Sequence, residues 1–415
     1  MILRVVSMSI AVALAACSNS EVSSPVPLDG FGGTHVALQP ASHERNAASE
    51  AVIYDFGGKT PDGTAPNQTL TDVRGTLYGE TYGNTGSKLG TIFTVTPLGS
   101  ETVLHTVIRK QGLRFSQLVL GPRPTGGGLS LYGTGKDGGA YSYGTIVRVT
   151  LSGAVIVLHS FTGGADGAHP AAGLVNVNGT FYGTTRDGGV YSHGTVFSVT
   201  PSGTENVIYA FRGATQDGGQ PEASLVNLNG TLYGTTVDGG SSRCGGPSRC
   251  GTVFSVTASG TEHVLHSFQG GSDGEYPQAG LIAVDGTLYG TTAVGGGAGC
   301  SMGCGTVFSI TPSGTQTILH RFTGGADGVF PAAMLLALNG KMFGTTQEGG
   351  NGCISGCGTV FSITPSGTET ILHRFTGGAN GWIPYGGLIN IHATLYGVTG
   401  LGGTYNDGTV YSITL

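Results

Sequence analysis

The chain has 415 residues, of which 78 are glycine and only 10% are charged, against usual shares of roughly 7% and 25%. This composition excludes coiled coils, helical bundles and acidic disordered tails. The net charge of -6 comes without any basic block, which argues against a nucleic-acid partner.

The N-terminus has the features of a bacterial lipoprotein signal. Arg4 precedes an apolar run, residues 5–14, that is too short to cross a bilayer. The run ends in Leu-Ala-Ala-Cys, which resembles a lipobox. We therefore expect residues 1–17 to be a signal peptide and Cys17 to be lipidated on an exported protein. Because Ser18 and not aspartate follows, the outer membrane or cell surface is favoured. A plain secretory signal is the alternative.

Residues 18–50 are rich in Ser, Pro, Gly and Ala and show no periodicity. Such a segment predicts a flexible tether. Its length corresponds to a reach of roughly 30 Å, so the folded part would stand away from the membrane that holds the lipid.

The rest of the chain repeats one unit seven times. Three markers recur in the same order: a Leu-Tyr-Gly triplet, a Gly-Thr-Val-Phe block and a His or Tyr that follows apolar residues. The triplets are centred on Tyr78, Tyr132, Tyr182, Tyr233, Tyr289, Phe343 and Tyr396. A repeat of roughly 50 residues with strand-like alternation is typical of the blades of a β-propeller.

Each unit is predicted to hold four short strands. In the third unit these are 173–177, 180–185, 194–200 and 206–211, separated by turns such as Asn178-Gly179. We predict an all-β fold, a seven-bladed propeller over residues 51–415. Its units are approximately 57–107, 108–161, 162–211, 212–268, 269–322, 323–375 and 376–415 plus 51–56.

The two ends of the repeat region complement each other. Residues 51–56 are a fourth strand without its first three, and 409–415 are a third strand without its fourth. In a closed ring the N-terminal strand would complete the last blade and leave no open edge. A linear stack of repeats gives no reason for this complementarity, so a closed ring is favoured.

The repeated blocks GTLYGTT and GTVFSVTPSGTE, followed by a Gly-Gly and Asp-Gly segment that ends in proline, resemble the GloVer-type tandem repeat of bacterial extracellular proteins. The resemblance covers essentially 51–415 and departs at 109–123 and at His392-Ala393. It implies an exported, variously anchored repeat protein without an established reaction. A looser similarity to kelch blades supports the propeller fold but implies no function.

The longer connections join strands two and three of a unit, or lead from strand four into the next unit. In a propeller both sets fall on one rim, which is the candidate binding face. Six cysteines lie there as pairs, and their even number and spacing predict three local disulfides, with zinc binding as the alternative. They would stiffen the loops, either for durability or to order a binding surface. The pairs are Cys244 and Cys250, Cys300 and Cys304, and Cys353 and Cys357.

Two further residue sets on this rim are candidate ligand contacts. Flat aromatic side chains beside acidic and amide groups suit sugar rings or a peptide. Loop packing for the aromatics and turn formation for Asp-Gly are the alternatives, and one Asp per blade is spaced too widely for calcium. The candidates are Tyr276, Phe330 and Trp382, together with Asp273, Asp327 and Asn380.

The sequence contains no nucleophile elbow, no zinc-protease motif and no unrepeated set of catalytic residues. We expect no cofactor and no metal. The sequence favours a non-catalytic surface propeller that binds a glycan or a protein. A carbohydrate-active lyase or hydrolase, and a purely structural envelope protein, are the alternatives.

Overall fold

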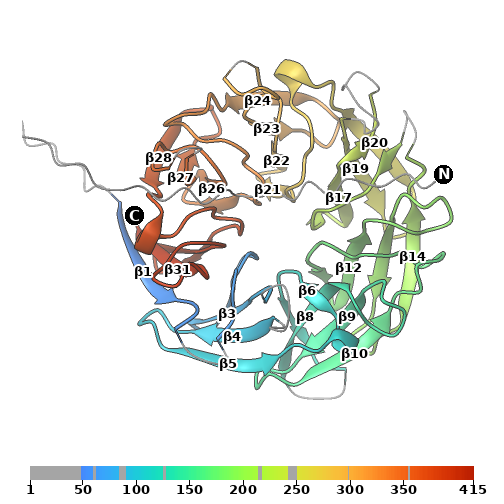
Figure 1. Ribbon diagram of the computed structural model, residues 1–415. Coiled ribbons are helices and arrows are strands. Elements are labelled where there is room, and N and C mark those ends of the chain that lie inside the picture. The colour runs from blue at the N-terminus through green and yellow to red at the C-terminus, as the bar shows by residue number, and fades with distance from the viewer. Residues whose placement is uncertain are drawn as a thin grey trace, which may run out of the picture. The chain divides into compact units, whose positions relative to one another are not determined.

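The computed structural model describes residues 48–58, 62–83, 90–124, 128–213, 217–241, 250–297, 299–353 and 356–415. All of them belong to Asn46–Leu415, the second of the two parts into which the chain divides. This part is a ring of seven antiparallel sheets, each built on four strands (Figure 1). The predicted all-β, seven-bladed propeller is therefore confirmed. In the described part of the chain, no helix has the length and apolarity that a membrane crossing requires.

In each blade the first strand lies nearest the centre of the ring and the fourth at its circumference (Figure 1). The strands of blades 1 to 3 are β2 (Thr71–Val73), β3 (Thr76–Glu80), β4 (Thr91–Val95) and β5 (Glu101–Thr106); β7 (Val119–Pro122), β8 (Leu129–Asp137), β9 (Thr145–Val149) and β10 (Val155–Ser160); and β11 (Val175–Val177), β12 (Thr180–Thr185), β13 (Thr195–Val199) and β14 (Glu205–Ala210).

Blades 4 to 7 follow the same order. Their strands are β16 (Val226–Leu228), β17 (Thr231–Thr236), β19 (Thr252–Thr257) and β20 (Glu262–Ser267); β21 (Ile282–Val284), β22 (Thr287–Thr292), β23 (Thr306–Ile310) and β24 (Gln316–Arg321); β25 (Leu336–Leu338), β26 (Lys341–Thr346), β27 (Thr359–Ile363) and β28 (Glu369–Arg374); and β29 (Ile389–Ile391), β30 (Thr394–Thr399), β31 (Thr409–Thr414) and β1 (Ser49–Asp55).

Short elements complete the rim. They are β6 (Leu113–Phe115), which pairs with the end of β8, the two-stranded pair β15 (Gly218–Gly219) and β18 (Asp238–Gly239), and three single-turn 3-10 helices, η1 (Arg109–Gln111), η2 (Gly271–Asp273) and η3 (Gly378–Asn380).

The N-terminal strand closes the ring. β1 lies antiparallel to β31, with Ser49 opposite Thr414 and Asp55 opposite Thr409 (Figure 1). The strand begins at Ser49, two residues before the predicted one. Blade 7 thus combines the two ends of the described chain, which removes an exposed sheet edge at that point.

The hydrophobic core lies between neighbouring blades. Phe211, after the outer strand of blade 3, packs edge-to-face against Phe254 of blade 4, with ring centroids 5.0 Å apart. The same kind of contact joins five further pairs of blades. Glycine follows the repeated tyrosine because a Cβ on Gly234 would lie 2.7 Å from the Phe254 ring and 2.8 Å from Leu225.

The turn between β29 and β30 is the one inner hairpin without glycine. His392 and Ala393 have φ angles of +49° and +64°, whereas the equivalent turns use pairs such as Asn178-Gly179 and Asn229-Gly230 with the same positive angles. A type I′ turn needs positive φ at both central residues, which costs L-residues other than Asn and Asp about 1 kcal/mol each.

We therefore expect the double variant His392→Asn with Ala393→Gly to be more stable than the parent by about 1–2 kcal/mol. Denaturant unfolding would measure this difference. The reverse change in blade 3, Asn178→His with Gly179→Ala, should destabilise by a similar amount. If both double variants unfold like the parent, backbone strain in this turn is negligible.

Candidate functional site

The two sets of long loops meet on one rim of the propeller, as predicted from the strands that they connect. Backbone bridges join the loop that enters a blade to the loop between its second and third strands. They pair Ala168 with Asp187, Glu275 with Val294, Val329 with Glu348, and Trp382 with Leu401. All sequence candidates that the structure describes therefore lie on this face.

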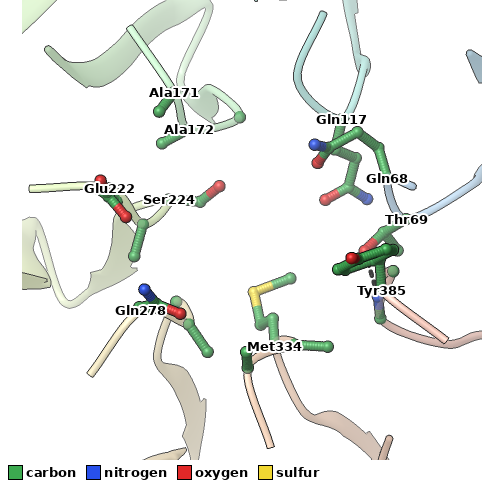
Figure 2. Close-up of a pocket in the computed structure, with 18 of the residues that line it drawn as sticks. Gln68, Thr69, Gln117, Ala171, Ala172, Glu222, Ser224, Gln278, Met334 and Tyr385 are labelled. Atoms are coloured by element: carbon green, nitrogen blue, oxygen red, sulfur yellow. Dashed lines mark hydrogen bonds between the residues drawn. The ribbon is translucent and has the colours of Figure 1, made fainter. Parts of the chain in front are cut away.

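A pocket of about 100 Å³ opens at the centre of this rim (Figure 2). Every blade contributes the short segment that leads into its innermost strand. Figure 2 shows the lining side chains arranged around a common opening, with amide and hydroxyl groups predominating. The polar lining includes Asn67, Gln68, Thr69, Gln117, Glu222, Ser224 and Gln278, and Met334 and Tyr385 are its large apolar members.

Sequence reasoning missed this pocket. Its signal was nonetheless present, because the segment after each repeated proline varies strongly between units: Glu222 follows Pro221, Gln278 follows Pro277 and Tyr385 follows Pro384. Tyr385 keeps 42% of its surface exposed and lies over Gly400, where a Cβ would come within 2.7 Å of the ring.

A ring of strained residues surrounds the pocket. One residue in each blade, at the entry to the innermost segment, has a φ angle between +52° and +58°. In six of the blades its N–H bonds a carbonyl of the preceding blade, as from Tyr276 to Cys250 at 3.1 Å, and in blade 2 Arg114 lies in β6, which pairs with β8. Such angles in non-glycine residues cluster at functional sites. The seven residues are Ala65, Arg114, His169, Gln220, Tyr276, Phe330 and Ile383.

This ring includes two of the three aromatic candidates. Tyr276 and Phe330 occupy equivalent positions, but the third equivalent residue is Ile383 and not Trp382. Trp382 lies one position earlier, packs partly against the core of blade 7 and donates its indole N–H to Asn406 at 3.4 Å. None of the three candidates lines the central pocket.

The acidic and amide candidates join neighbouring blades. The Asp273 carboxylate lies 3.2 Å from His266 Nε2 and accepts the Gln269 N–H at 2.8 Å. Asp327 and Asn380 contact His320 and His373 in the same way, at 3.1 and 3.3 Å. Blade 2 lacks Asp-Gly but places Gln111 2.7 Å from His105. The repeated His or Tyr of the outer strand and the repeated Asp of the following loop thus form one kind of contact, which recurs between successive blades.

A third residue, at the start of the next blade's outer strand, completes several of these contacts. Burial and the nearby Asp166 raise the pKa of Glu205 to about 7. Burial and Asp217 likewise raise the pKa of Glu262 to about 7, and burial is the main cause of the same rise at Glu369. In blade 5 the equivalent residue is Gln316, whose amide group helps to lower the pKa of Asp273.

Among the described residues, one group of three has its possible ligand atoms within 4.8 Å of one another, namely His320, Asp327 and Glu369. The same arrangement recurs with Gln316 in place of Glu beside His266 and Asp273. We therefore interpret the group as part of the repeated blade contact.

Two predicted disulfides are confirmed, Cys300–Cys304 and Cys353–Cys357. The cysteine before each repeated Gly-Thr occupies the place that Tyr143 has in blade 2. A Cβ added to Gly324 would touch both sulfurs of the first pair. A Cβ added to the equivalent Gly163 would touch the Tyr143 ring. The disulfides thus anchor the loop between the second and third strands to the loop leaving the blade. Cys244, like the predicted lipidation site Cys17, lies outside the described residues.

One buried carboxyl breaks the repeat. Glu80 stands where Thr184 and Thr235 donate hydrogen bonds to carbonyls of the next blade at 3.3 and 3.1 Å. Burial raises the pKa of Glu80, and a hydrogen bond with the Phe115 backbone opposes this rise. Glu80 is only 4% exposed and is not among the residues that line the pocket.

These features define a seven-bladed β-propeller with a central polar pocket on its loop-bearing rim. The chain belongs to the Gloeobacter/Verrucomicrobia repeat family, whose profile matches residues 30–247 and 240–415. The resemblance noted from the repeated blocks is thereby confirmed. No curated protein sequence matches the chain significantly.

Solved structures with a similar fold include puromycin hydrolase in complex with PGG (TM-score 0.52, 13% identity, covering 80% of this chain and 50% of that chain). Puromycin hydrolase alone matches with a TM-score of 0.50 and 12% identity, covering 84% of this chain and 52% of that chain. A gluconolactonase from Xanthomonas campestris matches with a TM-score of 0.43 and 10% identity, covering 89% of this chain and 90% of that chain. This chain spans about half the length of the puromycin hydrolase chains, and at these identities the likeness shows the fold alone.

Proposed function

We propose that this propeller is a non-catalytic binding protein whose central pocket holds one end of a glycan. The observation that carries the proposal is the lining of the pocket. Amide and hydroxyl groups of Gln68, Thr69, Gln117, Ser224 and Gln278 surround it. Neutral donors and acceptors of this kind match the hydroxyl groups of a sugar.

An aromatic face completes the complementarity. The half-exposed ring of Tyr385 lies at the edge of the pocket beside these polar groups, and pyranose rings stack on such faces through their C–H groups. Asn67 Oδ1, at the pocket wall, is buried and has no hydrogen-bond partner among the described residues.

The size of the pocket limits what enters it. Small-molecule sites usually measure about 300–1,000 Å³, whereas this pocket has about 100 Å³. Only a terminal ring or a single substituent can be held, and the remainder of the ligand must lie across the rim. The proposed ligand is therefore the end of a chain.

The location of the protein follows from the N-terminal sequence. We propose that residues 1–17 direct export, that lipid on Cys17 holds the protein at the outer membrane or cell surface, and that 18–50 tether the propeller. This arrangement would present the pocket to polysaccharides of the envelope or of the surroundings.

The binding proposal predicts that two pocket variants, Tyr385→Ala and Gln278→Ala, weaken glycan binding by about tenfold or more. Both side chains are exposed, so stability should change by less than about 0.5 kcal/mol. A glycan array, followed by calorimetry on the best ligand, would measure the effect.

Trp382→Ala is the matched comparison, because Trp382 lies on the same rim but outside the pocket. Equal losses in all three variants would place the ligand on the rim and not in the pocket. A parent protein that binds no glycan on the array would contradict the proposed function.

A further inference from the structure

Cationic side chains lie on one part of the rim around the pocket, whereas carboxylates also occur elsewhere on it, at Glu275 and Glu348. Two rings of residues surround the pocket: the strained ring described above, and the residue just beyond the second strand of each blade, whose equivalent in blade 2, Lys136, lies within β8. The latter bonds the former, as from Val237 N–H to the Gln220 carbonyl at 3.2 Å. Equivalent positions in the seven blades can therefore be compared directly.

The second ring changes character halfway around. Its members in blade order are Tyr82, Lys136, Arg186, Val237, Ala293, Gln347 and Gly400. The strained ring changes in the same sense, from Arg114, His169 and Gln220 to Tyr276, Phe330 and Ile383. In these two rings the cations Arg114, Lys136 and Arg186 lie on blades 2 and 3, whereas the members on blades 5 to 7 carry no charge. Ala65 in blade 1 and Val237 in blade 4 are apolar, and Gln347 in blade 6 is polar.

The charged side holds two groups of contacts, one in each of two neighbouring blades, which together are called the ionic arc; Lys136 acts electrostatically on Asp187 between them. The Arg114 guanidinium lies 5.8 Å from the centre of the Tyr82 ring and 3.4 Å from Asp137. In the next blade Asp187 contacts His169 at 3.1 Å and Arg186 at 3.7 Å.

Both ends of the ionic arc reach the pocket. Asn67, which lines the pocket in blade 1, hydrogen-bonds the Tyr82 hydroxyl. Arg186 Nε lies 2.5 Å from Glu222, which lines the pocket at blade 4. The arc therefore adjoins the pocket at these two points.

Charges in the arc balance. Arg114, Lys136 and Arg186 face Asp137, Asp187 and Glu222. Burial tends to raise the pKa of Asp187, but the hydrogen bond from His169 and the charges of Arg186, His169 and Lys136 outweigh it and lower the pKa. An added anion would gain little from cations that already have partners, and it would meet three carboxylates.

A row of alternating charged donors and acceptors suits neighbouring hydroxyl groups, because each hydroxyl accepts from a cation and donates to a carboxylate. We propose that the ionic arc selects a neutral sugar residue by its vicinal hydroxyls, while Tyr385, which lies outside the arc in blade 7 beside Thr69 (Figure 2), receives the apolar face of the ring. This inference rests on the proposed glycan-binding function and specifies its ligand as uncharged.

The test compares terminal sugars. Neutral disaccharides that end in glucose, galactose, mannose or xylose, and the glucuronic and galacturonic acid counterparts of the first two, are titrated into the full-length protein. We expect the best neutral disaccharide to bind at least about tenfold more tightly than its uronate. Its affinity should change little up to about 0.5 M salt, because no net charge is neutralised on binding.

Arg186→Gln and Glu222→Gln should each reduce affinity for that neutral sugar by about tenfold. Arg321→Gln on the circumference, where Arg321 bonds the Ser272 carbonyl at 3.2 Å, is the control and should bind like the parent. The thermal midpoint of each variant checks that the fold is kept.

Three outcomes overturn the inference. Uronates that bind more tightly, with an affinity that falls with salt, would show an anion site. Unchanged binding in both arc variants, with loss in Tyr385→Ala, would leave the pocket but remove the arc from recognition. Absence of binding to any of these sugars or to the array would overturn the inference and the proposed function together.

Discussion

Deletion of residues 49–56 is expected to open the ring and to abolish cooperative unfolding at the temperature of the parent. The deletion removes the whole ladder between β1 and β31 and the side chain of Phe56, which is fully buried against Phe93. Loss of a buried phenylalanine alone costs about 3–5 kcal/mol, a large share of the roughly 5–15 kcal/mol that a typical fold possesses.

Thermal unfolding followed by circular dichroism would measure this loss. Light scattering should detect association of the variant, because the freed edge of β31 can pair with another copy. Val52→Ala is the control: Val52 lies in the same strand but is 37% exposed, and its truncation should cost less than about 1 kcal/mol. A deletion variant that melts as sharply and as late as the parent would show that closure is dispensable.

Stability is expected to fall as the pH rises from about 4.5 to about 7. Glu205, Glu262 and Glu369 have pKa values near 7 in the folded protein, against 4.5 for an unperturbed glutamate, chiefly because they are partly buried. The folded state therefore holds these protons more tightly than the unfolded chain. Their stabilising effect is complete below pH 4.5 and is lost by pH 7.

Each carboxyl should contribute about 1 kcal/mol, since these groups are only partly buried and water screens them. Below about pH 4 the trend reverses, because Asp273 and Asp327 have lowered pKa values and their stabilisation is lost when they are protonated. Maximum stability is thus expected in mildly acidic solution.

The triple variant Glu205→Gln, Glu262→Gln and Glu369→Gln checks the assignment. Blade 5 already carries glutamine at this position, Gln316, beside His266 and Asp273, so the substitution fits the fold. The variant should be more stable than the parent at pH 7 by about 2–3 kcal/mol and should lose the decline between pH 4.5 and 7. A parent-like pH profile would mean that other groups control it.

Repetition explains what could be predicted. Seven copies of each marker reveal the blade, and the incomplete units at 51–56 and 409–415 reveal the closure that β1 and β31 form. Pairing between Asp273 and His266 was harder to predict, because each residue recurs separately and only the fold places them 3.2 Å apart. The bulge in each outer strand, such as the shift between Val253 and Phe254, contributes to that placement.

The candidate site was less predictable because it uses the positions that the repeat does not share. Trp382 is the single tryptophan of the sequence, yet the residue equivalent to Tyr276 is Ile383. The shift by one position is visible only in backbone angles. Glu222, Gln278 and Tyr385 converge only because seven short segments point to one axis (Figure 2), and no local pattern encodes that convergence.

In the strained ring the backbone conformation is the same in every blade, whereas the side chain differs. Alanine, arginine, histidine, glutamine, tyrosine, phenylalanine and isoleucine occupy the same backbone position in one chain, where the hydrogen bonds come from main-chain groups. Most of these side chains lie outside the hydrophobic core clusters, and Phe330, which packs against one of them, is the exception. Mutations at one position per repeat can therefore change the binding specificity of this surface while the fold is kept. Hypervariable loops diversify on a constant framework in the same way.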